Sequence, residues 1–381
     1  MGNPREPVIV GIGRTAYSKN SGRTPLGMAV QAGREAIADA GLAPTDVEGV
    51  ATFAVNDSAT CAQVGYGLGL PGTIFNLDLH GGGNIAVFVV TQAMYAVQAG
   101  ICDTVLVFRS LNSRSGKRFG TVTGAMECDG VAQFPGPHGY LVPGQWIAMW
   151  ARRHMAKYGT THEDLGAVAI SYRRHAERNE HALSREPLTL EGYLAGRWIN
   201  DPFRVYDCAR EADGAVAVVV TTRERARDLP HPPIRMLGTA EYMGAGGYND
   251  AWPKMEEMYS AHVAPRLWER SGVKPADMDF ACLYDCFTYT GLVTTEDYGF
   301  CAKGEAGDFY RSGRATYGGD VVINPHGGLL SEAYIHGMNH HYEAVLQLRG
   351  GAGARQVPDA RLALVSGGAL GYGGAVVYAR D

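Results

Sequence analysis

A glycine-rich turn, a long apolar helix pattern and a β-branched strand occur in that order twice in the 381 residues. The first copy runs from Gly81-Gly82-Gly83 to the strand Thr104 to Phe108, and the second runs from Gly327-Gly328 to the strand Arg361 to Val365. Self-similarity of this kind indicates two copies of one supersecondary unit. Two such units facing each other would place a site at their pseudo-twofold interface, near helix N-termini.

Short β-branched runs alternate with helical patterns elsewhere too, which is typical of parallel strands covered by helices. We therefore predict an α/β fold with an N-terminal half over residues 1–230 and a C-terminal half over 231–381. A stretch over about 112–200, rich in Gly, Pro, His and Arg, interrupts the first half. Strands are predicted at 8–10, 49–54, 74–79, 104–108, 215–221, 234–241, 280–284, 362–366 and 376–379, and helices at about 25–40, 85–99, 145–158, 255–271 and 330–348.

Composition excludes several classes of protein. The 34 Lys and Arg against 39 Asp and Glu give a net charge of -5 without any block of like charges, which argues against nucleic acid as the main partner. No apolar run reaches the roughly 18 residues of a membrane helix and the first residues are polar, so we expect a cytoplasmic protein without membrane insertion. The seven cysteines fit neither a disulfide framework nor a four-cysteine zinc site.

Two motifs are weaker than they look. Gly11-Ile12-Gly13 follows a strand, but the next helix pattern begins only near Pro25, so a tight turn is a better interpretation than a dinucleotide site. His336 and His340 have helical spacing, yet no H-E-x-x-H motif accompanies them. We interpret them as a packing pair and predict no bound metal.

Three polar segments lie where predicted strands end or helices begin, which is where ligands bind in α/β proteins. They are Tyr284 to Thr288, Asn324 to Gly337, and Ser366 to Gly371. Polar side chains at the end of a buried strand are costly unless they bond or react. Glycines in the other two segments allow backbone to approach a ligand closely.

Together these segments resemble the thiolase superfamily over nearly the whole chain. The opening Ile9 to Thr15, the central helix ending at Gly100, the Asp-Cys-Phe segment, the Asn-Pro-x-Gly-Gly segment and the terminal Gly-Gly run follow that family's order and spacing. Asp285-Cys286-Phe287 is most similar to the sterol-carrier-protein-x and lipid-transfer-protein branch. The resemblance implies a thiolase fold: two similar βαβαβαββ halves with central helices between two mixed sheets, plus a loop-domain insertion.

The chain departs from this family at every catalytic position. The nucleophilic cysteine falls on Gly83, the histidine of Gly-His-Pro on Tyr334, the Asn or His before the acidic residue on Tyr284, and the second cysteine on Ser366. Without a thiolate no acyl-enzyme forms, so we do not expect thiolysis or Claisen condensation by the family's ping-pong route. Cys286 and Cys301 lie elsewhere and are interpreted as packing cysteines.

Two tyrosines and a retained thioester pocket suit a retro-aldol cleavage of a β-hydroxyacyl-CoA, which needs a base, an enolate-stabilising site and an acid. The pattern resembles lipid-transfer-protein aldolases, which cleave a 17-hydroxy steroid side-chain CoA thioester into a 17-keto steroid and propionyl-CoA. By this resemblance Tyr284 and Tyr334 are catalytic, with Tyr334 favoured as the base, and no cofactor is needed because coenzyme A belongs to the substrate. Supporting or oxyanion roles fall to Gly83, His326, His336, Ser366, Gly368 and Asp285.

The same resemblance implies a homodimer and a separate OB-fold subunit of the zinc-ribbon type, together forming a dimer of heterodimers. Two alternatives stay open at this point. One is a catalytically inactive thiolase-like carrier or scaffold for lipid-CoA; the other is a thiolase-type acyltransferase with an unrecognised nucleophile, which Gly83 contradicts.

Overall fold

The computed structural model describes residues 5–116, 118–120, 133–244 and 254–381. Ten strands form one large mixed sheet in the order β10-β9-β11-β12-β8-β1-β7-β4-β2-β3. The strands of the N-terminal half are β1 (Pro7–Arg14), β2 (Gly49–Ala54), β3 (Phe75–His80), β4 (Thr104–Asn112) and β7 (Asp213–Thr222). Those of the C-terminal half are β8 (Ile234–Met243), β9 (Phe280–Cys282), β10 (Val322–Ile323), β11 (Leu362–Ala369) and β12 (Tyr372–Arg380).

The two halves repeat one topology. Reading inward from β3 gives β3-β2-β4-β7-β1, and reading inward from β10 gives β10-β9-β11-β12-β8, with the same parallel and antiparallel pairings in each. This duplication confirms the thiolase-type fold. The sheets of the two halves are joined into one, because Val8 pairs with Arg235 and Ile9 with Ile234, so that β1 and β8 lie edge to edge.

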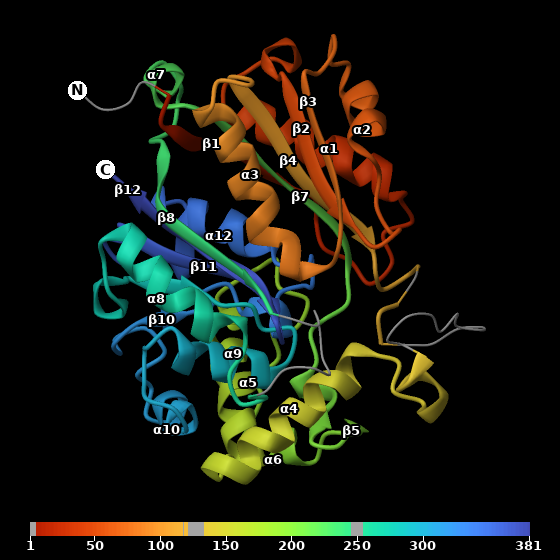
Figure 1. The fold of residues 1–381 in the computed structure, drawn as a ribbon, viewed down its shortest axis with the longest axis vertical. Coiled ribbons are helices and arrows are strands. Elements are labelled where there is room, and N and C mark those ends of the chain that lie inside the picture. Colours follow the sequence, from red (N-terminus) through yellow and green to blue (C-terminus); the bar gives the residue numbers. More distant parts are fainter. Residues whose placement is uncertain (1–4, 117, 121–132, 245–253) are drawn as a thin grey trace.

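Helices pack on the sheet in both halves: α1 (Pro25–Asp39), α2 (Cys61–Leu68) and α3 (Ala86–Gln98) in the first, and α8 (Tyr259–Ser271) and α12 (Met338–Leu348) in the second. The other helices of the second half, α9 (Thr288–Asp297), α10 (Ala306–Arg311) and α11 (Gly328–Ser331), pack mainly on other helices. The α3 helix has no charged residue and is apolar on nearly all sides, which fits a helix in the centre of a protein. It contacts strands of both halves, as α12 does (Figure 1).

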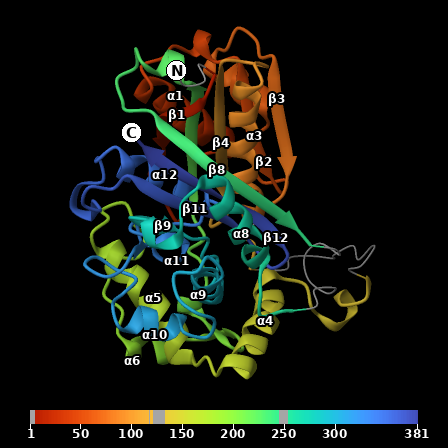
Figure 2. The same cartoon turned by 60° about the vertical axis from the view of Figure 1, so that its left-hand side comes forward.

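The segment between β4 and β7 carries α4 (Pro143–Tyr158), α5 (His162–Glu177), α6 (Leu190–Leu194) and the small hairpin β5 (Trp198–Asn200) with β6 (Phe203–Arg204). A short helix, α7 (Arg223–Ala226), follows β7. Figures 1 and 2 show α4 to α6 gathered at the opposite end of the molecule from α1 and α2. The domain boundary at residues 230 and 231 stays a prediction.

Local sequence explains the first helix and corrects one motif. Thr24 accepts a hydrogen bond from the Gly27 amide at 3.1 Å and Pro25 begins the helix, as predicted. Gly11 and Gly13 form no turn, because β1 continues to Arg14. A Cβ on either glycine would lie 2.2 Å from a backbone oxygen of α1, so the two glycines let the helix pack directly on the strand.

The long helix predicted over 330–348 is interrupted. Residues 332–337 lie between α11 and α12, with His336 at φ 50° and Gly337 at φ 84°. Left-handed backbone ends a helix, and its cost at a histidine points to a functional constraint. Within the described residues, no helix is both long enough and apolar enough to cross a membrane.

Candidate active site

The site lies where β9 and β11 end, because the carboxyl ends of adjacent parallel strands meet at one edge of a sheet. Tyr284 follows β9 and is 2% exposed. Its backbone N–H donates to Ser366 Oγ on β11 at 3.0 Å. Ser366 therefore supports the site by fixing the backbone of Tyr284.

Tyr334 comes from the interruption between α11 and α12. Its N–H donates to the Arg210 carbonyl at 2.8 Å, which fixes the turn. The hydroxyl oxygens of Tyr284 and Tyr334 lie 2.8 Å apart, and the ring planes meet at 62°. Two residues separated by 50 positions are thus brought into direct hydrogen-bond contact.

Gly83 explains how this pair fits. A Cβ at Gly83 would lie 1.8 Å from the Tyr284 hydroxyl oxygen and 2.3 Å from Cζ. The Tyr284 side chain therefore lies in the space that any side chain at position 83 would need. Whether the Gly83 backbone also serves an oxyanion hole stays a prediction.

His336 lies beside the pair, its ring centroid 4.9 Å from that of Tyr334. It is 2% exposed, and Arg109 of β4 donates to its Nδ1 through Nη2 at 3.0 Å and through Nε at 3.3 Å. Arg109 also forms a 2.6 Å ion pair with Asp57. Sequence reasoning missed Arg109 and Asp57, although an arginine directly after the apolar run 104–108 was an available signal.

Asp285 acts on the neighbouring turn. Its carboxylate accepts hydrogen bonds from the amides of Leu329 at 2.9 Å and Leu330 at 3.1 Å. Burial raises the pKa of this carboxyl, and His340 and the two amides counteract the rise. A Cβ on Gly328 would lie 2.2 Å from the carboxylate, so the two hydrogen bonds of Asp285 require glycine at this position.

His326 is connected to the tyrosine pair through His340. Its Nε2 lies 3.0 Å from Nδ1 of His340, and the His340 ring lies edge-on to Tyr284 at 6.4 Å between centroids. Burial is the main reason that the pKa of His326 falls well below its usual range. Cys282 completes a buried group whose ligand atoms lie within 4.8 Å of one another, but the two imidazoles already use one nitrogen each on the other.

Gly368 is separate from the tyrosine pair. It lies in β11 with φ 133°, where a Cβ would meet the Gly373 backbone at 2.5 Å and the Tyr259 ring at 2.9 Å. Its lack of a side chain lets β11 and β12 approach each other.

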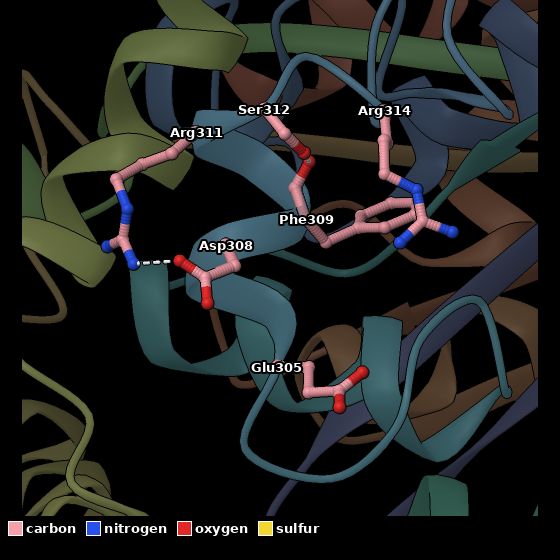
Figure 3. Close-up of a pocket in the computed structure, with 6 residues that line it drawn as sticks. All are labelled: Glu305, Asp308, Phe309, Arg311, Ser312 and Arg314. Atoms are coloured by element: carbon pink, nitrogen blue, oxygen red, sulfur yellow. Dashed lines mark hydrogen bonds and ion pairs between the residues drawn. The ribbon is translucent and has the colours of Figure 1, made fainter.

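The hollow in Figure 3 lies away from the tyrosine pair. It lies on α10, is lined by Phe309 and charged side chains such as Asp308 and Arg311, and includes neither tyrosine.

The repeated topology, the central helices and the site at the ends of β9 and β11 define a thiolase-fold protein whose two cysteine positions hold glycine and serine. Residues 251–380 match the family model described as "Thiolase C-terminal domain-like". The chain belongs to the steroid side-chain-cleaving aldolases of this superfamily, as the resemblance predicted.

Two relatives carry that assignment. The 17-hydroxy-3-oxo-4-pregnene-20-carboxyl-CoA lyase of Mycobacterium tuberculosis is 44% identical over 357 residues, covering 91% of this chain and 92% of the relative. The steroid side-chain-cleaving aldolase of Thermomonospora curvata is 42% identical over 377 residues, covering 96% and 95%.

Among solved structures, the "Ltp2-ChsH2(DUF35) aldolase" superposes with a TM-score of 0.93 at 40% identity, covering 100% of this chain and 99% of the other. Human mitochondrial 3-ketoacyl-CoA thiolase in complex with CoA superposes with a TM-score of 0.72 at 15% identity, covering 100% and 99%. The second likeness shows the fold alone.

Proposed function

We propose that this protein is a carbon-carbon lyase that cleaves the side chain of a 17-hydroxy steroid CoA thioester into a 17-keto steroid and propionyl-CoA. The observation that carries the proposal is the hydroxyl pair of Tyr284 and Tyr334, 2.8 Å apart in the space left by Gly83. The two relatives named for this chemistry, each above 40% identity over most of the chain, supply the substrate class.

The reaction needs two proton transfers and no redox step. A phenolate takes the proton of the β-hydroxyl, the carbon-carbon bond breaks, and its electron pair moves into the thioester to form an enolate. A phenol then donates its proton to the α-carbon, which gives propionyl-CoA and leaves the ketone. Because coenzyme A belongs to the substrate, the proposal includes no separate cofactor.

Covalent acyl transfer is the weaker alternative. The six cysteines of the described residues are free thiols, and Cys128 lies outside those residues. Burial raises the pKa of Cys286 and of Cys301 to about 12 each, which keeps both thiols protonated. Neither of these two thiols is a nucleophile at neutral pH.

The assembly we propose contains two copies of this chain and two copies of an OB-fold subunit of the zinc-ribbon type. The proposal is supported by the solved structure that superposes with a TM-score of 0.93, whose name, "Ltp2-ChsH2(DUF35) aldolase", includes a DUF35 protein. The homodimer is supported by β3, which forms one edge of the sheet and lies beside two well-exposed side chains, Tyr66 and Ile74.

A product assay tests the function. The protein, alone and co-expressed with the OB-fold subunit, is incubated with a 17-hydroxy steroid side-chain CoA thioester, and short-chain acyl-CoA is measured by mass. Release of propionyl-CoA and the ketone supports the lyase. Tight binding of the thioester without cleavage in either preparation would instead favour a carrier or scaffold.

A further inference from the structure

A buried cation lies one imidazole ring away from the tyrosine pair. Arg109 is fully buried, and its guanidinium contacts Asp57 at 2.6 Å and His336 Nδ1 at 3.0 Å. The His336 ring lies against Tyr334, so the contacts run from Asp57 through Arg109 and His336 to the tyrosine.

The guanidinium determines the state of His336. An arginine side chain has donors only, so Nδ1 of His336 must accept and the proton of the neutral ring resides on Nε2. Burial, and then the charge of Arg109, lower the pKa of His336 well below its usual range. The positive charge at this side of the site therefore belongs to Arg109 and not to an imidazolium.

The charge also reaches the phenols. Burial lowers the pKa of Arg109, whereas Asp57, Tyr334 and Tyr284 raise it, in that order of strength. The same interaction acts on the tyrosines in return, since a cation close to a phenol favours the phenolate. Of the two phenols, Tyr334 is the one whose ring packs on His336, which the guanidinium binds.

We propose that Arg109 is a positioning residue that holds His336 neutral and stabilises a phenolate on Tyr334, which makes Tyr334 the base and Tyr284 the acid. The assignment of base and acid rests on the proposed lyase function; the stabilised phenolate does not. At 2.8 Å, the Tyr284 hydroxyl donates to the Tyr334 phenolate, and a hydrogen bond to an ionised acceptor is stronger than one between neutral groups.

Other ionisable groups lie near the pair, and the hydrogen bonds that each already makes determine how strongly it influences the ionisation of the phenols alongside Arg109. Asp285 accepts from two amides of α11. The backbone of Glu211 forms a β-bridge with Tyr334, and its carboxylate accepts from Arg118 and from the amides of residues 119 and 120. His340 lies edge-on to Tyr284. Among the described residues, the ionisable ones that these contacts link to the pair, directly or through one another, are Arg109, Asp57, His336, His340, Asp285, Glu211, Arg118 and Arg210.

The first test measures ionisation directly and needs no turnover. The tyrosinate absorbance of the full chain is titrated with pH, and the titration of Tyr334→Phe is subtracted. The difference should contain one phenol that ionises below the ordinary range. Arg109→Met should move that transition up by about one pH unit or more, and Asp57→Asn should move it down because the guanidinium loses its counter-charge.

A matched control separates charge from stability. Arg355 is another buried arginine paired with a carboxylate, Glu343, at 3.0 Å, and its Nη1 donates to the Ala352 carbonyl. In Arg355→Met the phenol transition of the difference titration should stay at the wild-type pH. If Arg109→Met fails to fold because Asp57 is left buried and unpaired, the double variant Arg109→Met/Asp57→Asn removes both charges, and Arg109→Lys should keep the transition near its wild-type position.

The second test is the pH profile of kcat/KM for cleavage, whose rising limb should move with the titration in each variant. A phenol transition that Arg109→Met and the double variant leave unmoved would overturn the inference, whether or not the protein is a lyase. If the phenol transition moves in these variants but the protein has no lyase activity, the effect of Arg109 on the phenol stands. The proposed function and its base and acid assignment would then be overturned.

Discussion

Replacing Gly83 with alanine places a methyl group where the Tyr284 hydroxyl lies. The added Cβ would be 1.8 Å from that oxygen, and real Cβ atoms approach other atoms to about 3.0 Å at closest. The hydroxyl must therefore move by about 1.2 Å or more. Because Tyr284 is buried and its backbone is bonded to Ser366, the ring cannot swing away without disturbing its neighbours.

The expected loss follows from that displacement. A misplacement of about 1 Å at a reacting group costs on the order of 10²-fold in rate. We expect Gly83→Ala to lower kcat by about 10² or more, with overpacking that reduces the free energy of unfolding by about 1–3 kcal/mol. Steady-state cleavage kinetics and urea unfolding measure the two quantities separately.

Two variants make the test specific. Gly82→Ala adds the same methyl group one residue earlier, where the nearest atoms lie 3.7 and 3.8 Å away, and should keep near-normal kcat. In a double-mutant cycle, Gly83→Ala should cost almost nothing further in a Tyr284→Ala background, since the clashing ring is gone. A Gly83→Ala enzyme that retains more than half of the wild-type kcat would refute the reasoning.

Three further outcomes are expected. Tyr284→Phe and Tyr334→Phe should each lower kcat by about 10² or more while leaving thioester binding nearly unchanged, as measured by kinetics and equilibrium binding; two fully active variants would contradict the mechanism. Ser366→Ala removes the acceptor for the buried Tyr284 amide and should cost about 1–3 kcal/mol in urea unfolding, and no loss of stability would contradict that anchor. Burial raises the pKa of Glu332 to about 7. The contribution of Glu332 to the free energy of unfolding should therefore fall as pH rises from about 4.5 to about 7, by up to about 1.4 kcal/mol per pH unit. A pH dependence of the free energy of unfolding that is the same in Glu332→Gln as in the wild type would contradict this prediction.

The sequence predicted the repeated architecture because its signals are local. Thr24 and Pro25 mark the start of α1, and β-branched runs mark the buried strands. The insertion was harder, because α5 has polar residues on much of its surface and its burial against other helices depends on tertiary contacts. The two-residue strand β10 is too short to leave any periodic signal.

The site was predicted in part for a similar reason. Motif order located Tyr284, Tyr334 and Ser366 in one place, where the structure brings all three together. The break at His336 was missed because the sequence around it continues a helical pattern, whereas its φ of 50° is imposed by the contacts of the folded chain. Arg109 and Asp57 lie 52 positions apart, and only the parallel pairing of β2 with β4 makes them neighbours.

The two ends of the ten-stranded sheet differ in their capacity to accept another strand. At one end, β3 presents six residues that alternate between partly buried and exposed; at the other, β10 has two buried residues, and the Ile323 amide is already bonded to Ala315. Edge-to-edge growth is thus available in one direction only. Two chains joined through β3 across a twofold axis would use both open edges and stop, whereas a sheet with two equal edges would continue into a filament.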